Sequence, residues 1–356
     1  MTEPQRRQQS PSGAEDLHRV TITDVARAAG VSVATVSKVI NERYGVAART
    51  SEHVQRVIEQ LGYESSLVAR SLRSHKTHVI GILVPEFEPF STEVLKGTSR
   101  AITGTGYELL AYSGGGRAGE VVGWERRYLS RLSGTLIDGA IMMTPTVVRT
   151  AGSVPVVAID PHAGPADSPT VDADSYAGAV LATEHLLQLG HRRIGFLGGR
   201  PDLDSARLRE DGYRDALASA GIPVDPELVR LGGYRRQVAA APTRELLSLA
   251  DRPTAIFAAN DLSAIGVLDV ARELGLTVPT DLSVVGFDNV PESALTEPPL
   301  TTVQQPLQEM GAQAVHLLLR LVHGDPGAST HVRLPTSLVR RGSTAPPAAT
   351  PGRAGG

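Results

Sequence analysis

Apolar residues follow two different spacings along this chain, and the spacing changes near His78. Between Thr21 and Leu61 they recur every three or four positions, which predicts amphipathic helices. After His78, short apolar runs without polar alternation are separated by longer helical stretches. Runs of this kind are typical of parallel strands that are buried on both faces. The pattern therefore predicts a small helical part followed by a larger α/β part.

Residues 21–41 have the pattern of two short helices around one tight turn. We expect the side-chain oxygen of Thr23 to start the first helix, where the charge of Asp24 suits the helix dipole. Gly30 can take the left-handed conformation that ends a helix, and Ser32 can cap the second helix. Small residues at the crossing let the two helices approach closely, as a helix-turn-helix requires.

The second of these helices has short or polar side chains on its outer face, so it could enter a DNA major groove. The residues of that face are Val33, Ala34, Thr35, Ser37 and Lys38. Lys38 could donate to guanine, and Val33 or Ala34 could touch a thymine methyl group. A third helix, capped by Thr50 or Ser51, is expected to close the small core. The simpler alternative is a helical hairpin whose outer face is only solvated.

The residues from Val20 to Asn41, V-T-I-T-D-V-A-R-A-A-G-V-S-V-A-T-V-S-K-V-I-N, resemble the N-terminus of the LacI/GalR transcriptional regulators almost position for position. The resemblance continues through Leu61-Gly62-Tyr63 and Ala69-Arg70-Ser71-Leu72, and it extends to Arg341. So long a match without gaps is specific. It implies a helix-turn-helix over residues 19–63 that binds double-stranded DNA. The implied DNA-binding residues are Thr21, Thr23, Ser32, Val33, Ala34, Thr35, Ser37, Lys38 and Asn41.

Residues 64–77 are expected to link the two parts. In the resembled family this segment forms a hinge helix, which pairs with its copy in a homodimer and wedges a leucine into the minor groove. Leu72 matches that leucine, and Ala69 matches the small residue that faces the partner. Such a wedge unstacks bases and bends the DNA into wider contact. Glu64 and two serines replace the family's usual Pro-Asn, which puts the affinity of this hinge for DNA in doubt. Alternatively, Leu72 only packs against the α/β part of the chain.

Two similar sets of strands and helices follow His78, which implies two lobes with a ligand cleft between them. The strand-forming runs are HVIGILVP, YELLAYS, DGAIMMT, VPVVAID, RRIGFLGG, TAIFAAN and DLSVVGFD. This arrangement matches the periplasmic-binding-protein-like α/β core that the resemblance implies for residues 78–341. We expect an N-lobe of residues 78–172 plus 291–323, and a C-lobe of residues 173–290 plus 324–341. Three crossovers would form the hinge between the lobes, near residues 160–172, 291–301 and 323.

Two further expectations concern the ends of elements. Pro242 lacks a backbone N–H, so we expect the helix that contains it to begin near Ala241. The terminal segments, residues 1–18 and 342–356, are rich in polar residues or in proline, alanine and glycine. We expect both to be disordered, because they cannot bury enough apolar surface to fold.

Polar residues come directly after several predicted strands, where a cleft between lobes would receive them. They are Asp160, Asn260 and Asp288, whose oxygens can accept hydrogen bonds from hydroxyl groups. In the resembled family, the arginine that matches Arg209 donates two hydrogen bonds to the ligand. The aromatic candidates for stacking on a ligand are Phe90, Trp124, Tyr176 and Tyr234. Two alternatives stay open: Asp261 and Asp288 can instead cap helices or turns, and Trp124 can instead pack inside the fold.

Composition excludes several classes of protein. The 356 residues include no cysteine, which excludes disulfide scaffolds and thiolate metal sites. The sequence shows no metal-ligand spacing, phosphate loop or serine nucleophile motif, so we expect neither an enzyme nor a cofactor. It shows no secretory signal or membrane-spanning run, and the cytoplasm is the expected location. Residues 1–76 carry 11 basic against 8 acidic side chains, while the whole chain has a net charge of −3. This uneven charge suits a basic N-terminal domain that binds DNA, followed by an acidic α/β part.

Taken together, these features predict a homodimeric repressor that binds a pseudo-palindromic operator and responds to a small molecule in the cleft. A mono- or oligosaccharide is the expected effector, because carboxylates and aromatic side chains suit hydroxyl groups and a sugar ring. A purine or a phosphorylated metabolite is the alternative with the same architecture. A solute-binding transport protein would require a signal peptide and no helix-turn-helix, and the sequence fits neither requirement.

Overall fold

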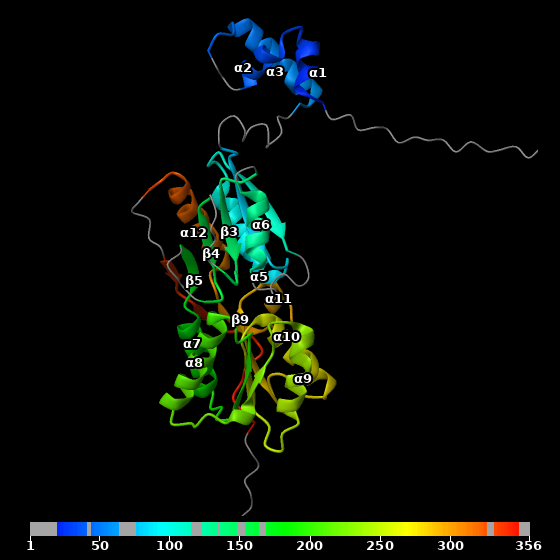
Figure 1. Ribbon diagram of the computed structural model, residues 1–356. Coiled ribbons are helices and arrows are strands. Elements are labelled where there is room, and N and C mark those ends of the chain that lie inside the picture. The colour runs from blue at the N-terminus through cyan, green and yellow to red at the C-terminus, as the bar shows by residue number, and fades with distance from the viewer. Residues whose placement is uncertain are drawn as a thin grey trace, which may run out of the picture. The chain divides into compact units, whose positions relative to one another are not determined.

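The computed structural model describes residues 20–40, 44–63, 76–114, 123–133, 136–147, 154–163, 169–325 and 331–348 (Figure 1). Contacts divide the chain into two units, Met1–Ser74 and His75–Gly356. Several predicted features lie outside the described residues: the tail 1–18, Asn41, and most of the hinge with Ala69 and Leu72. No helix in the described part is long and apolar enough to span a membrane.

The first unit contains three helices, α1 (Ile22–Ala29), α2 (Val33–Ile40) and α3 (Ala48–Leu61), among its described residues. The prediction that Thr23 caps α1 is wrong, because the cap is Thr21. Thr21 and Asp24 form a reciprocal capping box, in which each side chain accepts a backbone N–H of the other residue. Gly30 ends α1 with a φ of 64°, as expected, and the hydroxyl of Ser32 accepts the N–H of Thr35 at the start of α2.

The three helices enclose a core of small and β-branched residues. Its buried members are Val25, Ala26, Ala29, Val36, Val39, Val54 and Val57. The prediction that Thr50 or Ser51 caps α3 is wrong, because both residues lie inside the helix. Ala47 occupies the cap position and makes no side-chain bond there. Packing against α1 and α2 therefore fixes the start of α3, and no capping side chain is needed.

The N-lobe of the second unit is built on a six-stranded parallel sheet, counted over the described residues, with the order β11-β5-β4-β3-β1-β2. The strands are β1 (Val79–Val84), β2 (Glu108–Ser113), β3 (Gly139–Met143), β4 (Val156–Ile159), β5 (Thr170–Ala173) and β11 (His331–Leu334). The helices of this lobe are α5 (Pro89–Ile102), α6 (Trp124–Leu132) and α12 (Leu307–Val322). Helices α5 and α12 pack together over the sheet. Gly97 allows their close approach, since a Cβ atom there would lie 1.8 Å from the carbonyl oxygen of Gln308.

The C-lobe has a second sheet, which within the described residues also has six strands, in the order β12-β10-β9-β8-β6-β7. The strands are β6 (Ile194–Gly198), β7 (Val229–Leu231), β8 (Ala255–Ala258), β9 (Ser283–Asp288), β10 (Thr301–Gln304) and β12 (Ser337–Val339), which alone among them pairs in antiparallel fashion. The helices are α7 (Ser175–Gln188), α8 (Asp204–Ser219), the 3₁₀ turn η2 (Pro226–Leu228), α9 (Arg236–Leu247), α10 (Asp261–Glu273) and the short α11 (Pro291–Ala294). Figure 1 shows α7 and α8 on one side of this sheet and α9 and α10 on the other. Each side has its own apolar core.

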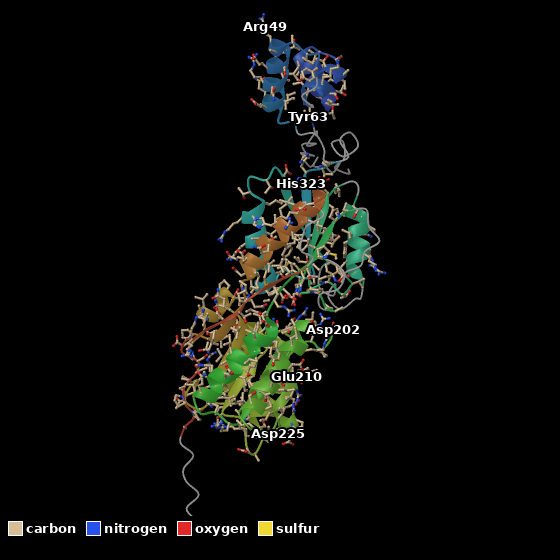
Figure 2. The ribbon with its side chains drawn as sticks, turned by 90° about the vertical axis from the view of Figure 1, so that its left-hand side faces the viewer. Arg49, Tyr63, Asp202, Glu210, Asp225 and His323 are labelled. Carbon is tan, nitrogen blue, oxygen red and sulfur yellow. The ribbon has the colours of Figure 1, made fainter. Side chains whose placement is uncertain are left out.

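Within the described residues, the chain passes between the two sheets three times, at Asp174, at Gln305-Pro306 and at Pro335-Thr336. The predicted second and third crossovers are wrong, because β10 pairs with β9 in the C-lobe and β11 pairs with β5 in the N-lobe. Apolar spacing locates a strand but does not say which sheet accepts it. Figure 2 shows Asp202 beside the gap between the lobes and His323 at the end of α12 far from the C-lobe.

Two further expectations about element ends are wrong. Helix α9 begins at Arg236 and continues through Pro242. The hydroxyl of the next residue, Thr243, donates to the carbonyl oxygen of Ala239. The predicted disordered tail is ordered from residue 342 to 348, because Ser343 is buried against β9. Its hydroxyl donates to the carbonyl oxygen of Val284, and its own carbonyl oxygen accepts the Val284 N–H.

Candidate functional site

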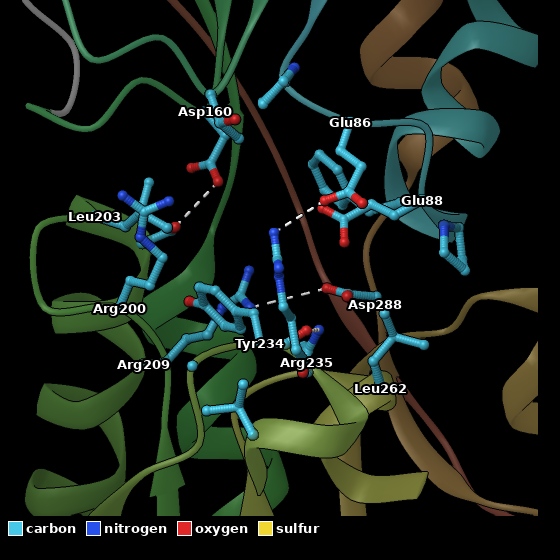
Figure 3. Close-up of a pocket in the computed structure, with 18 of the residues that line it drawn as sticks. Glu86, Glu88, Asp160, Arg200, Leu203, Arg209, Tyr234, Arg235, Leu262 and Asp288 are labelled. Carbon is cyan, nitrogen blue, oxygen red and sulfur yellow. Dashed lines mark hydrogen bonds and ion pairs between the residues drawn. The ribbon is translucent and has the colours of Figure 1, made fainter. Parts of the chain in front are cut away.

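A cavity of about 520 Å³ lies between the lobes of the second unit (Figure 3). This volume is within the range of small-molecule sites, roughly 300–1,000 Å³. Six of the predicted ligand-binding residues line it: Phe90, Asp160, Arg209, Tyr234, Asn260 and Asp288. Three helices begin at its wall, because the first residues or the caps of α5, α8 and α10 belong to the lining.

Arg209 is held in place on its own lobe. It projects from α8, is only 3% exposed, and donates to the carbonyl oxygen of Ala259 at 2.6 Å. Its guanidinium carbon lies 3.9 Å from the ring centroid of Phe287, and one of its nitrogens lies 3.8 Å from the Asp288 carboxylate. A planar cation stacked on a ring in this way is fixed before any ligand arrives. Its Nε–H donates to the Ser175 hydroxyl at 3.4 Å, and the Nη2 N–H groups, which make no hydrogen bond within the described residues, are the ones left for a ligand.

Asp288 and Asn260 lie at the ends of β9 and β8, where the strand-end argument placed them. Burial raises the pKa of Asp288 to about 7, against the opposing effect of the Arg209 guanidinium. The amide of Gln305, at a crossover between the lobes, donates to Asp288 at 2.6 Å. Asn260 caps α10 through the N–H of Ser263 and also donates to the carbonyl oxygen of Tyr234.

Asp261 has a structural role, as one of the alternative interpretations held. Its carboxylate accepts the N–H of Val290 at 2.9 Å and the hydroxyl of Thr302 at 2.5 Å. The side chain is fully buried, and burial raises its pKa well above the usual value. Asp261 does not line the cavity.

Asp160 and Tyr234 face the cavity from opposite lobes. Asp160 follows β4 and accepts the hydroxyl of Ser205, from α8, at 3.0 Å. Burial raises the pKa of Asp160, although nearby Arg209 opposes the shift. The Tyr234 hydroxyl is buried without a hydrogen-bond partner among the described residues, and burial raises its pKa to about 12. Tyr234 lines the cavity, while its hydroxyl is enclosed by the C-lobe beside Gly199.

Direct polar contacts join the lobes across the cavity. Arg235 of the C-lobe pairs with Glu86 of the N-lobe at 2.9 Å. The imidazole of His162 contacts the Asp202 carboxylate at 3.0 Å, and burial lowers the pKa of this histidine. The N–H of Asp204 donates to the carbonyl oxygen of His162. Since each contact joins one lobe to the other, opening the cleft must break all of them.

The backbone is strained around this cavity. Positive φ angles occur at Thr144 (43°), Asp160 (48°), Tyr234 (64°) and Asp288 (112°), all of which line the cavity, and at the adjacent Asn289. Side chains other than glycine rarely adopt this conformation. Strain of this kind costs on the order of 1–3 kcal/mol for each residue and gathers at functional sites.

Comparison with known proteins gives consistent matches for both units. Residues 21–66 match the family model described as bacterial regulatory proteins, lacI family, and residues 183–344 match the periplasmic binding protein-like domain. The HTH-type transcriptional repressor PurR of Haemophilus influenzae (strain PittEE) is 34% identical over 334 residues, which cover 90% of this chain and 98% of that protein. PurR of Aliivibrio fischeri (strain MJ11) is 36% identical, covering 85% and 91%. The chain belongs to the lacI family.

Solved structures of other lacI-family repressors share this architecture. The lac repressor dimer bound to operator and the anti-inducer ONPF matches with a TM-score of 0.79 and 29% identity, over 92% of this chain and 99% of that one. The transcriptional regulator CelR–cellobiose complex matches with a TM-score of 0.69 and 32% identity, over 91% and 100%. This protein is therefore a DNA-binding transcriptional repressor with a two-lobed α/β core, and its curated relatives are repressors and not enzymes.

On the DNA-binding unit of this lacI-family repressor, α2 exposes part of the predicted surface. Val33 is 42% exposed, Ala34 and Lys38 are also exposed, and Thr35 and Ser37 are half-buried. Some predicted residues have local partners. Thr21 bonds to Asp24, Ser32 bonds to Thr35, and Thr23 lies exposed within α1.

Two aromatic candidates do not reach the cavity of this repressor. Tyr176 is 38% exposed in the first turn of α7, and its hydroxyl donates to Asp215 of α8 at 2.9 Å. That turn packs against α8, which directs the side chain away from the cleft. Trp124 is buried at the start of α6, with its ring 5.7 Å from that of Tyr128, so it packs inside the fold.

Sequence reasoning missed several residues that line the cavity: Glu86, Glu88, His162, Arg200, Asp202 and Arg235. Glu86 and Glu88 come shortly after β1, so the strand-end argument would have found them. Arg235 lies in a loop before α9, and no sequence pattern indicates that its guanidinium crosses to the other lobe.

Proposed function

We propose that the interlobe cavity is the effector site of this repressor, and that its occupant is a small uncharged molecule. The observation that carries the proposal is the fixed Arg209 guanidinium, stacked on Phe287 beside Asp288, with Tyr234 lining the same cavity. Phe90 and Tyr234 offer aromatic surface to a ring. Asp160, Asn260 and Asp288 supply polar atoms that can fix its orientation.

Among uncharged effectors, we favour a purine base. The relatives that match nine tenths of this chain are repressors named PurR, which supports a purine over the sugar expected from the sequence. A planar base can stack on an aromatic ring, donate N–H groups to carboxylates and accept from Arg209. A sugar is the second candidate, because the regulator CelR, at 32% identity, has been solved as a complex with cellobiose.

On the DNA side, we propose that two copies of the chain bind a pseudo-palindromic operator with α2 in successive major grooves. Lys38, Val33 and Ala34 would then reach base edges, while Ala69 and Leu72 would act at the minor groove. Support comes from the exposure of α2 and from the lac repressor dimer on its operator. A repressor of this kind acts on the chromosome, so we place it in the cytoplasm. Thermodynamic linkage requires the effector and the operator to change each other's affinity by the same factor.

Titration calorimetry of the full-length protein against purine bases and against cellobiose, glucose and ribose tests the effector site. Arg209→Ala is expected to abolish binding of whichever compound binds, and to abolish its effect on operator affinity, while operator binding itself remains. Arg207→Ala is the matched control, because Arg207 lies on the same helix but pairs with Asp204 at the surface. Unchanged effector binding by Arg209→Ala would place the effector elsewhere.

A further inference from the structure

The arginines that line the cavity each have an acidic neighbour there. Arg200 makes a two-point contact with Asp202, at 3.1 and 2.7 Å. Arg235 pairs with Glu86 at 2.9 Å, and Arg209 lies 3.8 Å from Asp288. A ligand that carries negative charge would therefore have to compete with a carboxylate for every guanidinium in the described lining.

Two further carboxyl groups in the cavity wall, those of Asp160 and Glu88, form no ion pair with any residue that the structure describes. The Asp160 carboxylate accepts one hydrogen bond from the described residues, that of the Ser205 hydroxyl. The Glu88 side chain makes no hydrogen bond or ion pair in the part of the chain that the structure describes, although it occupies the cap position of α5. Burial and the neighbouring Glu86 raise the pKa of Glu88 against the opposing effect of Arg235, and burial raises the pKa of Asp160 against that of Arg209. Negative charge is thus already unfavourable in this cavity without a ligand.

Acidic residues also occupy the three helix starts that reach the cavity. The N-terminus of a helix favours anions because its first N–H groups and its dipole point there. Glu88 precedes α5, Asp204 is the first residue of α8, and Asp261 is the first residue of α10. Each of these carboxylates adds negative charge near a helix start that would otherwise favour a phosphate, and Glu88 does so from the cavity lining itself, whereas Asp204 and Asp261 lie outside it.

We infer that the effector carries no phosphate or carboxylate group, and that Glu88 and Asp160 accept hydrogen bonds from its N–H or O–H groups. Glu88 is the residue that sets this selectivity, since its carboxylate has no other partner in the described structure and lies beside Phe90 at the start of α5. Figure 3 shows the Glu88 carboxylate next to that of Glu86, facing the open part of the cavity. The inference rests on the proposed function, since it requires the cavity to be the effector site. The inference excludes a phosphorylated metabolite, which was one of the effectors that the sequence left open.

Matched pairs that differ by one phosphate test the inference directly. Calorimetry on the full-length protein compares adenosine with adenosine monophosphate, guanosine with guanosine monophosphate, and glucose with glucose 6-phosphate, beside the free purine bases and cellobiose. We expect any neutral member that binds to bind at least tenfold more tightly than its phosphorylated counterpart. Inorganic phosphate alone is expected to give no heat and no protection against thermal unfolding.

The variant Glu88→Gln is expected to reduce that selectivity at least several-fold, because it removes a negative charge and keeps the size of the side chain. Glu184→Gln, an exposed residue of α7 outside the cavity, is the matched control and should leave the selectivity unchanged. Equal or tighter binding of a phosphorylated member to the wild-type protein would overturn the inference and leave the effector site standing. If Glu88→Gln preserves the full selectivity, the inference is likewise overturned and the effector site likewise stands. Absence of binding by every compound, with Arg209→Ala indistinguishable from wild type, would instead remove the proposed site and the inference together.

Discussion

Effector affinity is expected to fall as the pH is lowered from about 8 to about 6, because Asp288 takes up a proton in this range. Burial raises the pKa of Asp288 to about 7, with Glu88 and Asp160 adding to the shift and Arg209 opposing it. The ionised carboxylate only accepts hydrogen bonds, whereas the protonated form turns one oxygen into a donor. An effector that donates to Asp288 therefore binds the ionised form.

The size of the effect follows from proton linkage. If only the ionised form binds, the apparent dissociation constant rises about tenfold at a pH one unit below the pKa, and changes little one unit above it. Calorimetry at about pH 6, 7 and 8 should therefore show roughly tenfold weaker binding at the acidic end. At about pH 7, binding should release roughly half a proton per effector, which appears as a dependence of the heat on the buffer.

Asp288→Asn isolates this residue, because asparagine can still accept the hydrogen bond from Gln305. In the variant, the pH dependence between about 6 and 8 should flatten, even if the affinity itself is lower. An affinity that is constant with pH in the wild-type protein, or one that increases on acidification, would refute the reasoning. So would a pH dependence that persists unchanged in Asp288→Asn.

Three further perturbations test the fold and the DNA-binding unit. Gly97→Ala places a Cβ atom 1.8 Å from the Gln308 carbonyl oxygen. We expect it to lower the free energy of unfolding by about 1–3 kcal/mol in denaturant titrations, whereas Ser99→Ala on the exposed side of α5 should not. Lys38→Ala removes an exposed cation from α2, so operator affinity should fall at least several-fold while effector affinity is unchanged; equal operator binding would exclude Lys38 from the reading surface. Burial lowers the pKa of His191, so the free energy of unfolding should fall as the pH drops below about 6.5; His191→Gln should weaken that dependence.

Much of the secondary structure could be predicted from the sequence because apolar spacing is a local signal. Each of the seven predicted strand-forming runs contains a strand of the fold. The helix start was predicted at Thr23 because Thr21 and Thr23 both precede Asp24 closely, and only the backbone conformation decides which of them forms the reciprocal cap. The distribution of β10 and β11 between the lobes depends on pairing between distant segments, which apolar spacing does not encode.

The residues of the candidate site also include some that a local sequence pattern predicts and others that depend on contacts between distant segments. Asp160, Asn260 and Asp288 could be placed because the ends of parallel strands share one edge of a sheet. Arg209 came from the resemblance alone. The pairing of Arg235 with Glu86 could not be predicted, since it depends on how two lobes face each other.

The positive φ angles at Asp160 and Tyr234 have a consequence for the evolution and engineering of this protein. At Tyr234, glycine would leave a void beside the C-lobe core, which would cost more stability than the relieved strain returns. Glycine at Asp160, by contrast, would relieve backbone strain and make the fold more resistant to heat. The same change would delete a side chain that lines the cavity. Selection for thermal tolerance alone would therefore enrich repressors that stay folded but no longer respond to their inducing or co-repressing metabolite. Screens for robust variants should measure gene control and heat resistance together.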